Sequence, residues 1–179
     1  LAKATADRQT NRFKPDRATL LDRLAALPLT EPDSLVSGPR VGAAFGSAGI
    51  AAGLLSAAAW TDRPDYLAAA DAWVSKAQAD SDHPDAFAAP RLDLHLTERD
   101  AHSLLYHRAG VLVVEGLVSA ALDDQRRGKA CAQRFAEQVR TLPNQTPWEF
   151  ASGRAGLLTA AALLSAAGLD AIEVVAQKP

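Results

Sequence analysis

The sequence contains one cysteine, Cys131, and no methionine. A single cysteine excludes a disulfide within the chain and any zinc site built from several of its own cysteines. An excess of one charge is also missing, because 19 Lys and Arg residues stand against 21 Asp and Glu residues, for a formal net charge of −2. General nucleic-acid binders carry a basic excess, so nucleic acid is not expected as a partner.

Long apolar runs are absent as well. The longest apolar stretch covers residues 155–169, which is shorter than the roughly 20 residues needed to cross a bilayer. Residues 1–20 carry several Lys and Arg residues but lack the apolar core of a signal peptide. We therefore expect a buried helix at 155–169, no membrane span and a cytoplasmic protein; a remnant of an organellar presequence is the alternative.

Alanine dominates what is present and makes up about a fifth of the 179 residues, whereas aromatic residues make up 6%. Alanine has the highest helix propensity because it loses no side-chain entropy in a helix. The hydrophobic fraction of 48% is large enough for a folded core. The composition therefore predicts an all-α protein.

Residues 1–34 are expected to form an N-terminal arm and a first helix, and residues 35–179 a separate helical unit. Pro15 and Pro28 bracket a predicted helix over 16–27. Four leucines at helical spacing predict its apolar face: Leu20, Leu21, Leu24 and Leu27.

A helical pattern recurs three times in the second unit. Segments near 46, 107 and 153 each end in an Ala-Gly pair and open a helix, at 48–60, 109–122 and 155–168, that is apolar on nearly every side. Such a helix is buried on most of its surface. Amphipathic helices at 65–80 and 126–141 follow the first two. Their predicted inward residues are Leu67, Ala70, Trp73, Val74 and Ala77 in one, and Ala130, Phe135 and Val139 in the other.

Repeats of paired helices build solenoids or closed rings. Inner helices with so little polar surface favour a double-layered α/α ring, covered outside by the amphipathic helices. Two pairs and part of a third make about half of such a ring. Five leucines of the last apolar helix cannot all be buried by the earlier pairs: Leu157, Leu158, Leu163, Leu164 and Leu169. A protein partner or a missing C-terminal half is therefore expected to cover 155–168.

The motifs resemble the amino-terminal half of lanthionine synthetase C-like (LanC-like) proteins. The carriers are Gly46-Ser-Ala-Gly-Ile, Ser103-Leu-Leu-Tyr-His-Arg-Ala-Gly and Phe150-Ala-Ser-Gly-Arg-Ala-Gly-Leu-Leu. In the family, each Gly-x-x-Gly opens an inner helix of an α/α toroid. The corresponding glycines are Gly46, Gly49, Gly110, Gly153 and Gly156, and His107 replaces the first glycine of the second motif.

The resemblance implies a chemistry for a complete family member. Its members add a thiol, from a peptide cysteine or glutathione, to dehydrated Ser or Thr residues. A zinc ion held by two cysteines and a histidine makes the thiolate at neutral pH, and these ligands belong to the carboxy-terminal half. This chain has none of those motifs, so it is expected to hold no cofactor and to be inactive alone. The alternative is a non-catalytic scaffold or subunit that kept the fold and lost the chemistry.

One functional position is matched. The cyclases carry a carboxylate four residues before the first glycine of the third motif, and Glu149 occupies that position here. The resemblance implies a general acid or base facing the central cavity, provided that burial raises its pKa. A solvated acid, or one that caps the next helix, is the structural alternative.

Other polar residues point more weakly to a site. His102 and His107 are not at the spacing that puts two metal ligands on one helix face. With Glu98 and Asp100 they suggest at most a metal site in a loop, and His83 and His95 have no ligand-spaced partner.

Lys129 and Arg134 flank Cys131 and would lower its thiol pKa modestly, although a small packing residue is the simpler interpretation. A basic stretch, taken as a solvated outer face, comprises Arg126, Arg127, Lys129, Arg134 and Arg140.

Overall fold

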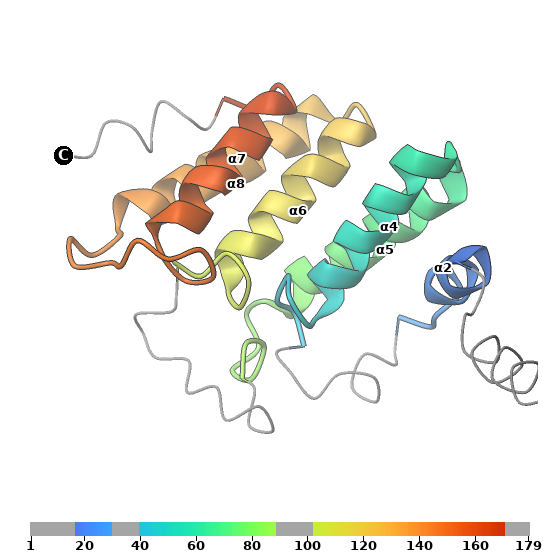
Figure 1. Cartoon of the computed structure of the whole chain (residues 1–179), viewed down its shortest axis with the longest axis horizontal. Coiled ribbons are helices and arrows are strands. Elements are labelled where there is room, and N and C mark those ends of the chain that lie inside the picture. Colours follow the sequence, from blue (N-terminus) through green and yellow to red (C-terminus); the bar gives the residue numbers. More distant parts are fainter. Residues whose placement is uncertain (1–16, 30–39, 89–101, 171–179) are drawn as a thin grey trace, which may run out of the picture.

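The computed structural model describes residues 17–29, 40–88 and 102–170. Within these ranges the chain forms six helices and no strand (Figure 1). They are α2 (Arg17–Ala25), α4 (Ser47–Thr61), α5 (Pro64–Asp80), α6 (Arg108–Ala121), α7 (Gln125–Arg140) and α8 (Arg154–Ala166). The all-α prediction is confirmed, and each predicted helix end lies within two residues of the observed one.

The helices form two layers. In Figure 1, α4, α6 and α8 lie side by side in front of α5 and α7, and α6 is the middle helix of the front layer. Helix α2 packs beside α4 and α5, on the side away from α6. The buried helices of the three predicted repeats thus share one layer, and the amphipathic helices form the other.

A residue with positive φ follows the end of each inner helix. Asp62 follows α4 with φ 53°, Asp123 follows α6 with φ 59°, and Gly168 follows α8 with φ 77°. A single left-handed residue ends a helix and turns the chain back. After α4 and α6 the chain then enters α5 and α7. Because α5 and α7 return the chain to the end from which α4 and α6 started, α4, α6 and α8 all run in the same direction (Figure 1).

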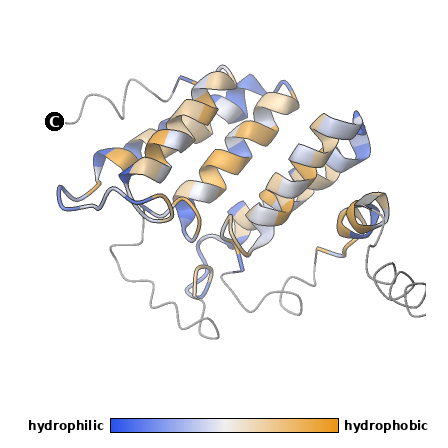
Figure 2. Cartoon of the chain, viewed as in Figure 1, coloured by the Kyte–Doolittle hydropathy of each residue, from blue (hydrophilic) through white to orange (hydrophobic). Residues whose placement is uncertain are grey.

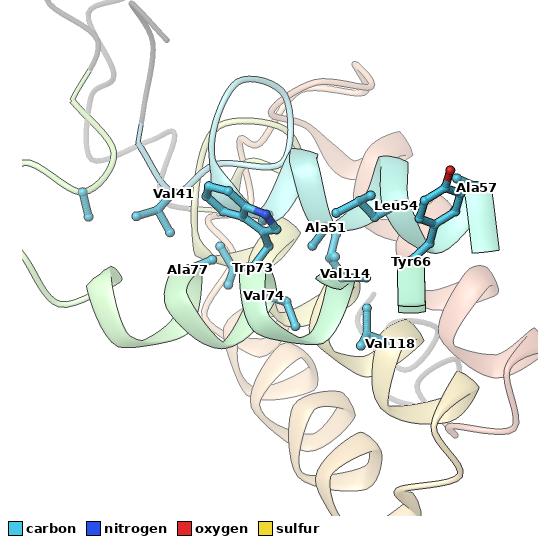
Figure 3. Close-up of a cluster of buried hydrophobic side chains, with 14 residues drawn as sticks. Val41, Ala51, Leu54, Ala57, Tyr66, Trp73, Val74, Ala77, Val114 and Val118 are labelled. Carbon is cyan, nitrogen blue, oxygen red and sulfur yellow. The ribbon is translucent and has the colours of Figure 1, made fainter. Parts of the chain in front are cut away.

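Two hydrophobic clusters share α6. Trp73, Tyr66 and Leu54 are the largest buried side chains of the first cluster, between α4, α5 and α6 (Figure 3). Phe135, Leu157 and Leu164 belong to the second, between α6, α7 and α8. Because α6 supplies valines to both clusters, ten of its residues are buried. Helix α6 therefore matches the sequence prediction of an inner helix that is buried on most sides.

Helices α4 and α8, at the two edges of the inner layer, are less buried than the sequence predicts. Only five residues each of α4 and α8 are buried, although apolar residues run along α8 (Figure 2). Leu158 is 42% and Leu163 47% exposed, whereas Leu157, Leu164 and Leu169 are buried. The five leucines are therefore not all covered, as the repeat pattern predicts.

The amphipathic faces were predicted with three errors. Leu20 is 47% exposed, whereas Leu21, Leu24 and Leu27 pack on the first cluster. Ala130 is exposed and Leu67 only half-buried. In α7, the inward face instead includes Cys131, Ala132 and Ala136 beside Phe135 and Val139. In each case the predicted helix is observed, and the rotation of the helix about its own axis determines which of its side chains are exposed.

In the part of the chain that the structure describes, no helix combines the length and the apolar character that a bilayer crossing requires.

Candidate functional site

The loops that precede the inner helices gather at one end of the molecule, because these helices run parallel (Figure 1). We call this the motif end and define it by residues 40–46, 102–107 and 147–153. It contains Glu149 and the first glycine of the outer two motifs. The second glycines lie one helical turn further on, inside α4, α6 and α8.

The second glycine of every motif faces a backbone carbonyl six residues earlier. A Cβ atom would lie 2.5 Å from Ala43 O if added at Gly49, 2.0 Å from Leu104 O at Gly110 and 2.0 Å from Phe150 O at Gly156. No side chain fits at such distances. Glycine lets each loop fold tightly over the start of its helix.

The first glycine is required for space in the outer two motifs. Added Cβ atoms would lie 2.5 Å from Arg40 O at Gly46 and 2.4 Å from Pro147 O at Gly153. Both positions have extended backbone, with φ of −113° and −114°. His107 takes the equivalent position with φ −135°, a conformation open to any residue. Its ring stacks on Phe87, with centroids 4.2 Å apart.

Hydrogen bonds join the three loops in register. The Ala44 N–H donates to Leu105 O at 2.9 Å, and the Leu105 N–H donates to Ala151 O at 3.2 Å. Ala44, Leu105 and Ala151 each lie two residues before the N-cap of an inner helix. We call this chain of bonds the loop ladder. It fixes the relative positions of the three helix starts.

Glu149 lies on the third loop and is exposed. Its carboxylate accepts hydrogen bonds from the Ala151 N–H at 3.1 Å, from the Ser152 N–H and from the Ser152 hydroxyl. The hydrogen bond from the Ser152 hydroxyl has the largest influence, and with the bonds from the two backbone amides it holds the pKa of Glu149 below its ordinary value, although burial acts in the opposite direction. The raised pKa that an acid catalyst needs is not what these contacts produce, so the acid–base role stays a prediction.

The loops of the motif end carry four aromatic side chains, of which Tyr106 is half-buried and the other three are exposed. Phe45 and Tyr106, at equivalent positions directly before their N-caps, stack with centroids 6.0 Å apart and planes 13° apart. Trp148 is 72% and Phe150 52% exposed, and the Arg154 guanidinium lies 5.7 Å from the Trp148 ring centroid. Sequence reasoning missed this group. The signal was the recurrence of an aromatic residue just before the first two inner helices.

The other candidate residues do not converge. His83 is exposed, His102 and His107 are half-buried in the second loop, and His95, Glu98 and Asp100 lie outside the described residues. Among the described residues, no three His, Cys, Asp or Glu side chains form a group that could hold a metal ion.

Cys131 is buried in α7, away from the motif end. Burial, followed by the neighbouring Glu115 carboxylate, raises the pKa of its thiol to about 12, although Arg127 and Arg134 act in the opposite direction. The expected lowering of this pKa by nearby positive charge is therefore wrong. The thiol stays protonated and fills space.

One residue of the basic stretch on α7, Arg127, departs from the predicted solvated outer face, because it is half-buried and paired. Arg127 donates to Glu115 of α6 at 3.0 Å and to Asp71 and Ser75 of α5. Burial disfavours its charge, but the hydrogen bonds to Asp71 and Glu115 outweigh burial and raise its pKa. Arg127 thus ties the two hairpins together, whereas Arg126, Lys129, Arg134 and Arg140 are exposed.

Comparison with known proteins agrees with the geometry of the motif end. The family model for lanthionine synthetase C-like proteins matches residues 43–177, which include all three motifs. No curated protein matches the chain. With three quarters of its length covered by that model, the chain belongs to the lanthionine synthetase C-like family.

Proposed function

We propose that this chain forms part of the wall and rim of a LanC-like cavity, whose complete form adds a thiol to dehydrated Ser or Thr residues of a peptide. The observation that carries the proposal is the repeated motif end. Three parallel helices start with the same glycine packing, and the loop ladder holds their starts together.

The zinc chemistry of the family does not fit the described residues of this chain. They contain no group of ligands, and the Cys131 thiol has a pKa of about 12 in the outer layer. We therefore assign no step of thiol activation to these residues. The role that their chemistry supports is binding of the substrate peptide at the rim.

The rim has surfaces suited to an extended peptide. Trp148 and the stacked Phe45 and Tyr106 expose aromatic area beside loops with backbone hydrogen-bonding groups. Aromatic side chains contribute large contact areas while losing little conformational entropy. An apolar peptide segment with a dehydroalanine residue therefore matches this end better than the opposite end, where Trp60 stands exposed at the end of α4.

Binding of a fluorescent dehydroalanine peptide by anisotropy tests this role. We expect Trp148→Ala to weaken binding about tenfold, in the range of a single aromatic contact, and Trp60→Ala, which removes an 83% exposed indole, to leave it unchanged. With zinc and glutathione added, the chain should not accelerate adduct formation. Equal effects of the two substitutions, or acceleration by the chain alone, would contradict the proposal.

A non-catalytic scaffold is the second candidate function. The exposed Leu158 and Leu163 of α8 favour it, because they offer an apolar surface away from the rim. Failure of the peptide to bind, together with normal folding, would favour this alternative.

A further inference from the structure

The end of the molecule opposite the motif end contains a cavity that the proposed function does not use. We call this the turn end and define it by residues 60–65, 121–126 and 167–170, which lie at and after the ends of the inner helices (Figure 1). The cavity has a volume of about 480 Å³ and lies where the end of α6 meets the turn from α4 to α5. Apolar side chains of these three helices form most of its wall: Leu55, Ala58, Ala59, Leu67 and Ala121.

A leucine fills the equivalent place in the next repeat. Leu169 follows α8, is fully buried, and packs against two glycines of the preceding hairpin. A Cβ atom added at Gly116 of α6 would lie 3.4 Å from Leu169 Cδ1, and one added at Gly128 of α7 would lie 2.8 Å from Leu169 Cδ2. The two glycines therefore leave room for the leucine side chain on the face of their hairpin.

The first hairpin has leucines where the second has these glycines. Gly116 lies six residues after the second glycine of its motif, and Leu55 lies six residues after that of the first motif. Gly128 lies four residues after the N-cap of α7, and Leu67 lies four residues after the N-cap of α5. Leu55 and Leu67 are both half-buried and line the cavity. The cavity thus occupies the place that Leu169 fills in the next repeat.

The residue that could fill the cavity from α6 is an acid. Leu169 lies 13 residues after Gly156, and Asp123 lies 13 residues after Gly110. Asp123 is exposed, and no side chain or N–H of the described residues donates to its carboxylate. A carboxylate remains in water rather than entering an apolar cavity, because burial of an unpaired charge is costly. The space between Leu55 and Leu67 is therefore left open.

The mouth of the cavity is acidic. Asp62 lines it, and its carboxylate, like that of Asp123, accepts from no described residue. Arg63 also lines the cavity, but its guanidinium donates to Asp22 at 2.7 Å and to Asp65 at 3.1 Å. The C-terminal ends of α4 and α6 add partial negative charge at this end. A bound cation is therefore favoured, whereas the acidic turn end of a second copy would be repelled.

We propose that the turn end binds a small primary ammonium compound with an apolar tail. The tail enters between Leu55 and Leu67, and the ammonium group pairs with the carboxylates of Asp62 and Asp123. A small molecule is the occupant because the cavity volume lies in the range of small organic ligands. The site lies at the opposite end from the peptide-binding rim and does not depend on the proposed function.

Phenethylamine is the probe, with 2-phenylethanol and 3-phenylpropionate as its neutral and anionic counterparts. In titrations of the full chain followed by methyl NMR, we expect phenethylamine to shift the signals of Leu55 and Leu67 saturably. The alcohol should bind about fivefold more weakly, the range of a solvent-exposed ion pair, and the carboxylate more weakly still. Added salt should weaken binding of the amine but not of the alcohol, because salt screens exposed charges.

Substitutions separate the charge of the site from its shape. The double variant Asp62→Asn and Asp123→Asn should weaken amine binding about fivefold and leave alcohol binding unchanged. Asp85→Asn, at an exposed carboxylate beyond the other end of α5, is the matched control and should change neither. Ala121→Phe fills the cavity from its exposed rim and should abolish binding of both compounds, and an unchanged unfolding midpoint would show that the fold is retained.

Four outcomes would overturn the proposal. They are equal binding of the three probes, an effect of Asp85→Asn as large as that of the double variant, signal shifts confined to residues outside the turn end, and no saturable shift below about 10 mM amine, a weak limit for a ligand of this size. Shifts of the Leu55 and Leu67 signals that depend on protein concentration alone would place a second copy in the cavity and would equally contradict it.

Discussion

At the scale of single residues, glycines of similar sequence context have opposite roles. Gly156 lies in α8 with the Phe150 carbonyl so close that a Cβ atom would be 2.0 Å away. Gly53 lies in α4, one turn after the first motif, and no atom lies within 4 Å of its added Cβ. The sequence shows both as glycine within an apolar helix. The nearby carbonyl alone separates a required glycine from a replaceable one.

Alanine at these two positions should change stability in opposite directions. Gly156→Ala forces the loop away from α8 and should lower the free energy of unfolding by about 1–3 kcal/mol or more. Gly53→Ala is the matched control and should raise it by roughly 0.5–1 kcal/mol, because alanine loses less backbone entropy in a helix. Urea denaturation measures both. Equal effects would show that the close approach at Gly156 does not exist in solution.

The contacts of Glu149 show where residue-level prediction ends. Its position before the third motif could be found from the sequence, because the motif fixes the register. Its hydrogen bonds could not, since they depend on the turn that brings the amides of Ala151 and Ser152 onto one carboxylate. The direction of a pKa shift follows from such contacts rather than from spacing.

At the scale of helices, the boundaries were accessible from sequence because polar residues, glycine and proline punctuate an alanine-rich chain. Pro64 stands at the first position of α5, and the Asp124 side chain accepts from the Arg127 N–H at the start of α7. These local signals need no tertiary contact. The partners of Arg127 are different, because its bond to Asp71 joins residues 56 apart. No local pattern predicts it.

Loss of Arg127 should loosen the join between the hairpins. Arg127→Met leaves Glu115, which is only 8% exposed, without its cation, and we expect a loss of roughly 2–4 kcal/mol. The double variant with Glu115→Leu should recover most of it, because apolar residues of similar size often replace a buried ion pair without loss.

Lys129→Met on the exposed face of α7 is the control, and its effect should stay within about 0.5 kcal/mol. Thermal or urea unfolding of the four proteins measures these differences. A double variant as unstable as Arg127→Met alone would mean that the buried charge is not the cause.

At the scale of the whole molecule, the two sides of the helical layer are unequal. Helix α2 packs on the α4 side, with Leu21 and Leu24 against the first cluster. The α8 side exposes Leu158 and Leu163. Exposed contiguous apolar surfaces on a monomer mark interaction sites or lead to aggregation. The repeat pattern predicted this open side, but it could not tell which leucines are exposed, because that depends on the rotation of α8.

The isolated chain should therefore self-associate through α8. Leu158→Glu and Leu163→Glu should shift it toward a monomer in sedimentation velocity experiments, because each places a charge on the open face. Leu164→Glu is unsuitable as a probe, since Leu164 is fully buried and its charge would unfold the protein. Leu20→Glu serves as the exposed control. A wild-type monomer that is indifferent to both substitutions would show that the α8 side is already closed.

The loop ladder also sets an order of assembly. Contacts within each hairpin join residues near in sequence, whereas the ladder bond from the Leu105 N–H to the Ala151 carbonyl joins two loops that a whole hairpin separates. Closing a longer loop costs more chain entropy before its contacts form. The hairpins should thus fold first and the motif end last. By the same reasoning, the motif end opens first in local fluctuations that leave the helix pairs intact.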